Sequence, residues 1–131
     1  MRAYKKRSSA VVTAVRLDLE TQGFSYEKWG GWQVCKPGDW LVDNAGDVYT
    51  IDRDTFERTY EEVSPGVYTK TAVVWARRAD SDGAIETKEG VTCYREGDYL
   101  VFNDPEGTDG YAVSAEKFES MYVPRDERNS E

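Results

Sequence analysis

The sequence predicts an α+β fold in which two tandem repeats, each an antiparallel β-meander closed by one short helix, pack as one pseudo-twofold domain. The first observation is that segment 36–44 (KPGDWLVDN) returns 59 residues later as segment 95–103 (REGDYLVFN), and such self-similarity marks a repeat architecture. The second is that each copy is followed by a turn, a helix-capping residue and a Phe-x-x-x-Tyr pair. A unit of about 60 residues buries too little surface to be stable alone, so we expect the two copies to share a core.

The repeat extends beyond these segments on both sides. Residues 10–14 (AVVTA) match residues 72–76 (AVVWA), and the second copy carries three extra residues within 104–108 (DPEGT). A Pro/Gly/Asp insertion is typical of a lengthened turn between strands. We therefore divide the single domain, residues 1–131, into repeat 1 at 10–64, repeat 2 at 71–124 and a polar tail at 125–131.

Strands are predicted where short runs of β-branched and aromatic residues lie between turn residues. The first-copy strands are predicted at 10–15, 32–35, 40–43 and 48–51, and the second-copy strands at 99–102 and 111–113. The turn Pro37-Gly38-Asp39 combines a fixed φ, a residue that tolerates positive φ and a side chain that bonds nearby backbone amides. Residues 1–8 are polar, and we expect them to be loosely ordered.

Each hairpin is followed by a helix whose start can be placed. Asp52 and Ser114 align and are good N-cap residues. Apolar residues stand just before each cap and four positions inside the helix, the spacing of a hydrophobic staple: Ile51 with Phe56, and Val113 with Phe118. Tyr60 and Tyr122 lie one turn further along the same face. We expect the first helix to run to about Val63 and to stop at Ser64-Pro65-Gly66.

With these motifs in place, the chain resembles the PGDYG family of small bacterial and phage-associated proteins, which share a Pro-Gly-Asp-aromatic motif. Here the motif reads Pro37-Gly38-Asp39-Trp40-Leu41, with Phe56 and Tyr60 downstream. The second copy departs from it because Glu96 stands in place of the proline, although Gly97-Asp98-Tyr99 is retained. The resemblance covers the core of each repeat. It implies no mechanism, because the family has no assigned activity.

Charge and hydropathy restrict the partners. The chain has 17 basic and 25 acidic residues, no histidine and a net charge of −8, which disfavours direct binding to nucleic acid or to an anionic membrane. No apolar run approaches the ~18–20 residues of a membrane span, and no signal-peptide hydrophobic region follows the basic N-terminus. We expect a cytoplasmic protein. Cys35 and Cys93 fall one register apart in the two copies, which favours free thiols, with a single disulfide as the alternative.

No catalytic or metal-binding constellation is evident. Asp39 and Asp98 are interpreted as residues that satisfy their own turns, with a pair of catalytic or metal-binding carboxylates as the alternative. A nucleophilic serine or cysteine generally needs a base, most often histidine. The spacing within 104–109 does not match an EF-hand calcium loop. The sequence therefore predicts no metal and no cofactor, and it favours a noncatalytic protein over a small hydrolase or nucleotide-processing enzyme.

The aromatic loop between residues 24 and 32 is the predicted binding element, with Tyr26, Trp29 and Trp32 as candidate binding residues. Its counterpart at 85–91 (IETKEGV) has no aromatic residue. Aromatic anchors dominate interface energies, so the loop is interpreted as a recognition surface for a protein or a small molecule. The alternative is that it covers the open end of the shared core. At the equivalent positions 40 and 99, which are both aromatic, packing is the expected role.

The leading hypothesis is therefore a noncatalytic binding module. The alternative is an acidic mimic of nucleic acid that occupies the basic groove of a DNA- or RNA-binding enzyme. Seven carboxylates cluster in the first copy, at Asp43, Asp47, Asp52, Asp54, Glu57, Glu61 and Glu62. Helix surfaces commonly carry such charges as solvated groups, so the cluster is compatible with either reading.

Overall fold

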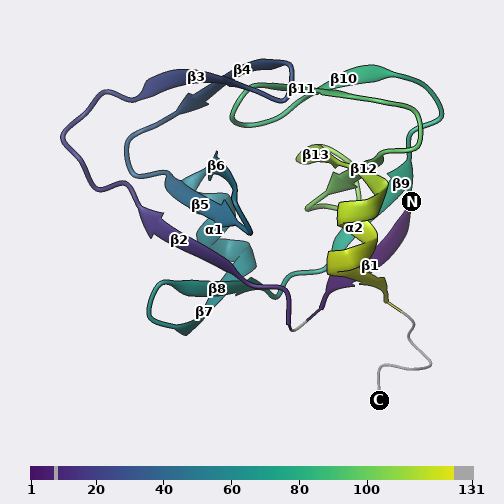
Figure 1. The fold of residues 1–131 in the computed structure, drawn as a ribbon, viewed down its shortest axis with the longest axis horizontal. Helices are drawn as coiled ribbons and strands as arrows, with labels where there is room; N and C mark the ends of the chain where they lie inside the picture. Colours follow the sequence, from purple (N-terminus) through teal and green to yellow (C-terminus); the bar gives the residue numbers. More distant parts are fainter. Residues whose placement is uncertain (8, 126–131) are drawn as a thin grey trace.

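The computed structural model describes residues 1–7 and 9–125. It is mostly antiparallel β-structure, with two five-stranded sheets, two two-stranded hairpins and two short helices in that part of the chain (Figure 1). This confirms the predicted combination of antiparallel strands with two short helices, and it is consistent with the predicted pseudo-repeat. The predicted meander is wrong, because β2 (Val12–Arg16) pairs with β5 (Trp40–Asn44) and β8 (Val67–Lys70) and not with the next strand in the sequence. Residues 126–131 of the predicted polar tail lie outside the described residues.

The two sheets have matching strand orders. The first sheet contains, in spatial order, β6 (Asp47–Ile51), β5 (Trp40–Asn44), β2 (Val12–Arg16), β8 (Val67–Lys70) and β7 (Tyr60–Ser64). The second sheet contains β13 (Gly110–Val113), β12 (Tyr99–Phe102), β9 (Val74–Arg78), β1 (Arg2–Lys6) and β14 (Tyr122–Pro124). Repeated segments of the sequence therefore occupy the same places in the two sheets.

Each sheet contains one strand from the other half of the chain. Strand β1 lies between β9 and β14, where Tyr4 pairs with Val74 on one side and Pro124 on the other. The expectation of a loosely ordered N-terminus is therefore wrong for residues 2–6. Backbone pairing on both edges holds this polar segment, and the Tyr4 ring packs edge-on against Phe118 at 4.8 Å. Strand β8 takes the matching place between β2 and β7.

The two helices are α1 (Arg53–Thr59) and α2 (Ala115–Met121). Both predicted N-caps are confirmed: the Asp52 carboxylate accepts from the Thr55 amide and the Ser114 hydroxyl accepts from the Lys117 amide. Helix α1 ends at Thr59 instead of near Val63. From Tyr60 onward the backbone is extended, because its amide and carbonyl groups pair with β8.

The helices close two separate apolar clusters instead of one shared core. In the first half Phe56 stacks on Trp40 and on Tyr60, each with ring centres 4.4 Å apart. In the second half Phe118 stacks on Tyr99 at 4.1 Å and on Tyr122 at 4.7 Å. The packing role expected for positions 40 and 99 is confirmed. The expected shared core is not found, because each half buries its own helix against its own sheet.

Two hairpins cross above the space between the sheets (Figure 1). One is β3 (Phe24–Lys28) with β4 (Gly31–Cys35), and the other is β10 (Gly83–Glu86) with β11 (Val91–Tyr94). The tip of each hairpin bonds to the other: the Cys93 amide donates to the Trp29 carbonyl at 2.9 Å, and the Val34 amide donates to the Glu89 carbonyl at 2.5 Å. The segment predicted as an aromatic loop is therefore a regular hairpin.

Glycines make this close crossing sterically possible. A Cβ on Gly31 would overlap the Val91 carbonyl oxygen, and a Cβ on Gly90 would overlap the Trp32 carbonyl oxygen. These two glycines occupy matching positions of the repeat. The buried Gln33 amide adds a side-chain bond across the junction, because its Nε2 donates to the Val91 carbonyl at 2.6 Å.

Candidate functional site

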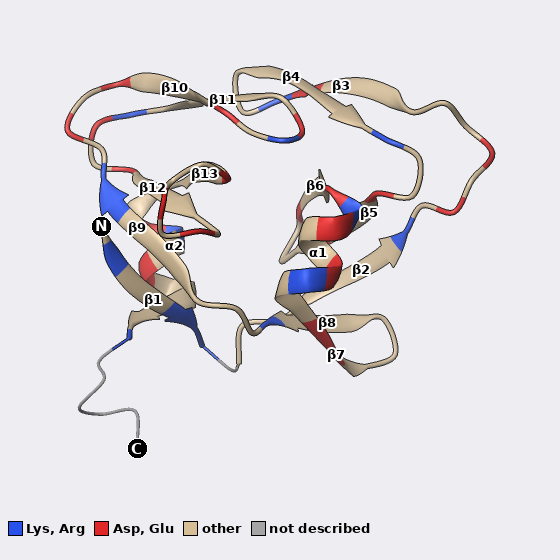
Figure 2. Cartoon of the chain, turned by 180° about the vertical axis from the view of Figure 1, so that it is seen from behind, with Lys and Arg blue, Asp and Glu red and all other residues tan. Residues whose placement is uncertain are grey.

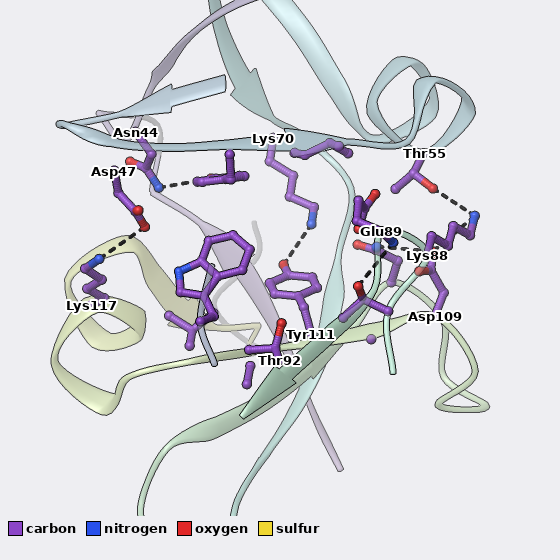
Figure 3. Close-up of a pocket in the computed structure, with 18 of the residues that line it drawn as sticks. Asn44, Asp47, Thr55, Lys70, Lys88, Glu89, Thr92, Asp109, Tyr111 and Lys117 are labelled. Carbon is purple, nitrogen blue, oxygen red and sulfur yellow. Dashed lines mark hydrogen bonds and ion pairs between the residues drawn. The ribbon is translucent and has the colours of Figure 1, made fainter. Parts of the chain in front are cut away.

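A cavity of about 340 Å³ lies between the two halves, and residues of both crossed hairpins contribute to its lining (Figure 3). Residues at matching positions of the two halves line it. They are Asn44 with Asn103, Asp47 with Asp109, Tyr49 with Tyr111, Tyr60 with Tyr122, and Lys6 with Lys70. The lysines match because Lys6 pairs with Tyr122 across β1 and β14, while Lys70 pairs with Tyr60 across β8 and β7.

Lys70 projects from β8 and its side chain crosses to the opposite half. The residue is only 5% exposed, and its Nζ donates a hydrogen bond to the Tyr111 hydroxyl at 2.9 Å (Figure 3). Burial away from water, together with the nearby Lys6 ammonium, lowers the pKa of Lys70 to about 7. Near neutral pH a large fraction of the Lys70 side chains therefore carries no charge.

Lys6 reaches the same cavity from β1. Its Nζ lies 5.4 Å from the centre of the Tyr60 ring, and the Nζ of Lys70 lies 5.7 Å from the same ring. Burial lowers the pKa of Lys6 to about 8, so Lys6 is mainly an ammonium at pH 7. Neither lysine has a carboxylate within ion-pair distance in the described chain.

Four tyrosines line the same cavity. Burial raises the pKa of Tyr49 to about 12 and raises the pKa values of Tyr60, Tyr111 and Tyr122 as well. All four are therefore neutral phenols that can donate and accept hydrogen bonds. The Tyr111 and Tyr122 hydroxyls lie 3.4 Å apart, which extends the polar contact of Lys70 toward β14.

Two of the acidic residues that line the cavity, Asp47 and Asp109, form ion pairs with cations from both halves (Figure 3). Asp47 pairs with Lys28 at 2.9 Å and with Lys117 at 3.3 Å. Asp109 pairs with Lys88 at 3.6 Å and with Arg58 at 3.9 Å. These two carboxylates are thus neutralised. Glu89 also lines the cavity, where it accepts from the Asp52 amide at 2.6 Å, and burial raises its pKa. Lys6, mainly an ammonium at pH 7, has no carboxylate partner within ion-pair distance in the described chain.

The three predicted binding residues occupy different environments. Trp29 lines the cavity, with its ring centre 5.3 Å from that of Tyr49. The Tyr26 hydroxyl lies 2.7 Å from the Thr50 hydroxyl and accepts from the Thr50 amide at 3.0 Å, which fastens the hairpin to β6. Trp32 is 60% exposed and does not line the cavity. Of the three predicted binding residues, Trp29 alone lines the cavity, and Trp32 lies on the exposed surface of the hairpin.

Trp29 has an uncommon backbone conformation. Its φ is +56° and that of Gly30 is +80°, the left-handed pair of a two-residue hairpin turn that normally carries Asn-Gly or Gly-Gly. A bulky residue with positive φ is strained, and such strain concentrates at functional sites. The strained turn places the indole ring in the cavity wall.

Sequence reasoning missed both lysines, although a signal was present. Residues 4–6 read Tyr-Lys-Lys and residues 68–70 read Tyr-Thr-Lys, so each half begins with a Tyr-x-Lys strand. Tyr68 packs edge-on against Phe56 at 5.1 Å, as Tyr4 does against Phe118. Extending the repeat toward each N-terminal end would have aligned the two lysines only with a gap, because three residues separate Lys6 from position 10 and one residue separates Lys70 from position 72.

The remaining candidate groups have local structural roles. Asp39 accepts from the Lys36 amide at 2.8 Å and Asp98 accepts from the Arg95 amide at 3.0 Å, so each carboxylate satisfies its own turn. Within residues 1–7 and 9–125, no group of three or more Cys, Asp or Glu side chains is arranged to hold a metal ion. Cys35 and Cys93 are both free thiols.

Several carboxylates of the first-half acidic cluster are also engaged locally. Asp43 accepts from the Gly46 amide and Glu57 accepts from the Trp40 indole. Figure 2 shows acidic and basic residues next to each other along the ribbon of α1. The mimicry of nucleic acid stays a prediction, whose test is salt-sensitive association with a basic protein.

No known protein family, curated protein or solved structure matches this chain. In the part of the chain that the structure describes, no helix is long and apolar enough to cross a membrane. The site itself must therefore supply the argument for function.

Proposed function

We propose that this protein is a noncatalytic binding module that holds a small organic anion in the cavity between its two halves. The observation that carries the proposal is the pair of amino groups, Lys6 and Lys70, that face one tyrosine ring without a carboxylate partner within reach in the described chain. Buried cations are normally paired. A carboxylate or phosphate of a ligand supplies the missing partner.

The size and walls of the cavity support a small molecule. Ligand pockets typically occupy roughly 300–1,000 Å³ and combine apolar or aromatic walls with a few polar groups. The cavity lies at the lower end of this range. Its walls include the Trp29 indole and four neutral phenols, which can pack against the carbon skeleton of the ligand and donate hydrogen bonds to its oxygens.

The repeat explains how such a site arises. We infer that the two halves are related by an approximate twofold axis through the cavity, since matching strands, tyrosines and lysines come from both sides. Each lysine then lies on a strand that precedes one repeat in the sequence but pairs in the sheet of the other repeat: Lys6 on β1 and Lys70 on β8. A ligand in the cavity bridges both halves, so its binding stabilises their association.

Thermal denaturation with simple anions tests the proposal. Succinate, benzoate and inorganic phosphate are added at constant ionic strength, and at least one is expected to raise the melting temperature in a saturable manner. Binding of an anion favours the protonated lysines, so affinity should weaken by about tenfold or more between pH 6.5 and pH 9.

Variants locate the effect. Lys6→Met and Lys70→Met should abolish the stabilisation, whereas Lys5→Met, on the exposed side of the same strand β1, should retain it. The proposal is overturned if none of the three anions binds, or if both cavity variants bind as the wild type does.

The outer face of the β3–β4 hairpin leaves room for a protein partner. Trp32 is 60% exposed, so the predicted recognition of a protein through this hairpin remains a separate proposal. A Trp32→Ala variant that captures the same set of proteins as the wild type would exclude it.

A further inference from the structure

The two cavity lysines match by position but differ in their surroundings. Lys70 is almost fully buried and donates to the Tyr111 hydroxyl at 2.9 Å. Lys6 is half-buried and has no hydrogen-bond partner within the described residues; its Nζ instead approaches the Tyr60 ring. One cavity therefore presents a shielded amine in contact with a phenol and, beside it, a second, better hydrated amino group.

A shielded amine beside another cation is the environment that makes a lysine nucleophilic. Desolvation and a neighbouring positive charge both favour the neutral form, which carries the lone pair that attacks carbonyl carbon. Lys70 has both features, because it is buried and lies near Lys6. The neighbour remains available as an ammonium for a carboxylate.

We propose that Lys70 captures a small 2-oxo acid in this cavity as a reversible Schiff base, while the Lys6 ammonium binds the carboxylate of the same molecule. This inference rests on the proposed anion site and names the chemical class of its ligand. It adds a covalent bond that simple anion binding does not require.

The reaction balances without an oxidant, a reductant or another co-reactant. The lone pair of Lys70 Nζ forms a bond to the carbonyl carbon, the C=O π bond breaks, and the oxygen receives a proton as the nitrogen loses one. In this carbinolamine the nitrogen lone pair forms the C=N bond as the C–O bond breaks, the oxygen takes a second proton from the Tyr111 hydroxyl and leaves as water, and the nitrogen then returns its remaining proton to Tyr111. Addition of water reverses each step and releases the oxo acid.

Tyr111 is placed to assist these proton transfers. Its hydroxyl already contacts Lys70 Nζ and lies 3.4 Å from the Tyr122 hydroxyl. Burial raises the pKa of Tyr111, so the group remains a neutral phenol that can receive a proton from nitrogen while it donates its own to oxygen. We assign Tyr111 as a positioning and proton-relay residue for Lys70.

The protonation of Lys70 depends on groups from several elements. Those that face it or act on it are Lys6 of β1, Arg58 of α1, Tyr60 of β7, Asp109 before β13, Tyr111 of β13 and Tyr122 of β14. Burial, Lys6 and Arg58 lower the pKa of Lys70, whereas Asp109 raises it. The net effect makes the amine reactive near pH 7, well below the pH at which an exposed lysine loses its proton.

Reductive trapping tests the inference. The full-length protein is incubated with pyruvate and sodium cyanoborohydride at pH 7, which converts a Schiff base into a stable secondary amine, and the modified residue is identified by peptide mass spectrometry. We expect one adduct, on Lys70. Its rate should reach half-maximum near pH 7, whereas labelling of exposed lysines should keep rising toward pH 10.

Variants separate the roles of the residues. Lys70→Met should remove the adduct, and Lys6→Met should slow its formation by about tenfold, the effect expected from losing one ion pair to the carboxylate. Tyr111→Phe keeps the ring and the amine, so it should slow the adduct without a comparable loss of succinate affinity. Lys5→Met should leave the rate unchanged. Far-UV circular dichroism verifies that each variant is folded.

The outcomes distinguish this inference from the proposed function. If succinate stabilises the protein but pyruvate labels only exposed lysines, the covalent step is wrong and the anion site stands. If pyruvate forms an adduct on Lys70 but the protein binds none of the simple anions, the anion site is rejected and the role of Lys70 as a nucleophile is supported. Absence of both binding and labelling would reject the two together.

Discussion

Lys6 and Lys70 hold their amino groups 5.4 Å and 5.7 Å from the centre of the same Tyr60 ring, although they belong to different sheets on opposite sides of the cavity. When both amino groups are protonated they repel each other, although an aromatic ring attracts a cation. Burial adds a further penalty for the charged forms. Burial of these two amino groups therefore opposes folding, which agrees with the anion site proposed above.

Replacing Lys70 with methionine should stabilise the protein at neutral pH. The unfolded lysine keeps its proton up to about pH 10.5, whereas the folded lysine loses it at about pH 7. The unfolded state therefore binds more protons over this interval, so wild-type stability should rise as the pH increases from 7 toward 10. We expect Lys70→Met to gain on the order of 1–3 kcal/mol at pH 7, measured by urea denaturation.

The pH dependence provides the control for this variant. Lys70→Met should flatten the rise between pH 7 and pH 9, leaving the smaller part that comes from Lys6, whose pKa is lowered to about 8. Lys5→Met should show the same increase of unfolding free energy with pH as the wild type. If Lys70→Met has the same unfolding free energy as the wild type and the same dependence on pH between pH 7 and pH 9, Lys70 is protonated in the folded protein over this range.

The turn carboxylates should differ in their contribution to stability. Asp39 is 1% exposed and accepts from the amides of Lys36 and Arg53, whereas Asp98 is half-buried and accepts from Arg95 alone among the backbone amides of the described chain. Unsatisfied buried donors are expensive. Asp39→Ala should therefore cost roughly 2–4 kcal/mol and Asp98→Ala roughly 1 kcal/mol in urea denaturation. Equal costs would contradict the additional role assigned to Asp39 at the start of α1.

The crossed hairpins should depend on Gly90. An alanine there would meet the Trp32 carbonyl oxygen, and a backbone clash of this kind typically costs roughly 1–3 kcal/mol or more. Gly46→Ala is the matched control, since its Cβ would meet nothing within 4 Å although its φ is +94°. We expect Gly90→Ala to lose protection of the Cys93 and Val34 amides in hydrogen exchange, while Gly46→Ala retains it. Unchanged protection in Gly90→Ala would show that the crossing tolerates a methyl group.

Trp29 should contribute to ligand affinity independently of Trp32. Trp29 lines the cavity and packs against Tyr49, whereas Trp32 is on the solvent side of the hairpin. Loss of one aromatic wall typically costs about 1–2 kcal/mol of binding, which is roughly tenfold in affinity. Titration of Trp29→Ala with benzoate should show this loss and Trp32→Ala should not. The reverse result would move the site to the outer face of the hairpin.

The sequence by itself determined the repeat, the Gly-Asp turns, the helix caps and the stacked pairs Phe56–Tyr60 and Phe118–Tyr122. The repeat is visible as self-similarity of the sequence. The turns, the caps and the Phe–Tyr pairs depend on residues only a few positions apart, where backbone geometry alone fixes which groups can contact each other. The sequence also identified β2, β4, β5, β6, β12 and β13, but not β1, β3, β7, β8, β10, β11 and β14. It also singled out Trp29, whose presence in only one copy is visible without coordinates.

Only the tertiary structure decided that β1 lies in the second sheet, that each half has its own core and that Lys6 and Lys70 line the same cavity. These features arise from pairing between residues far apart in the chain. A polar strand such as residues 2–6 has too little hydrophobic pattern to predict which strand it pairs with. Whether a lysine is solvated or buried depends on which strands cover it. The chemistry of the cavity therefore follows from the exchange of β1 and β8 between the halves.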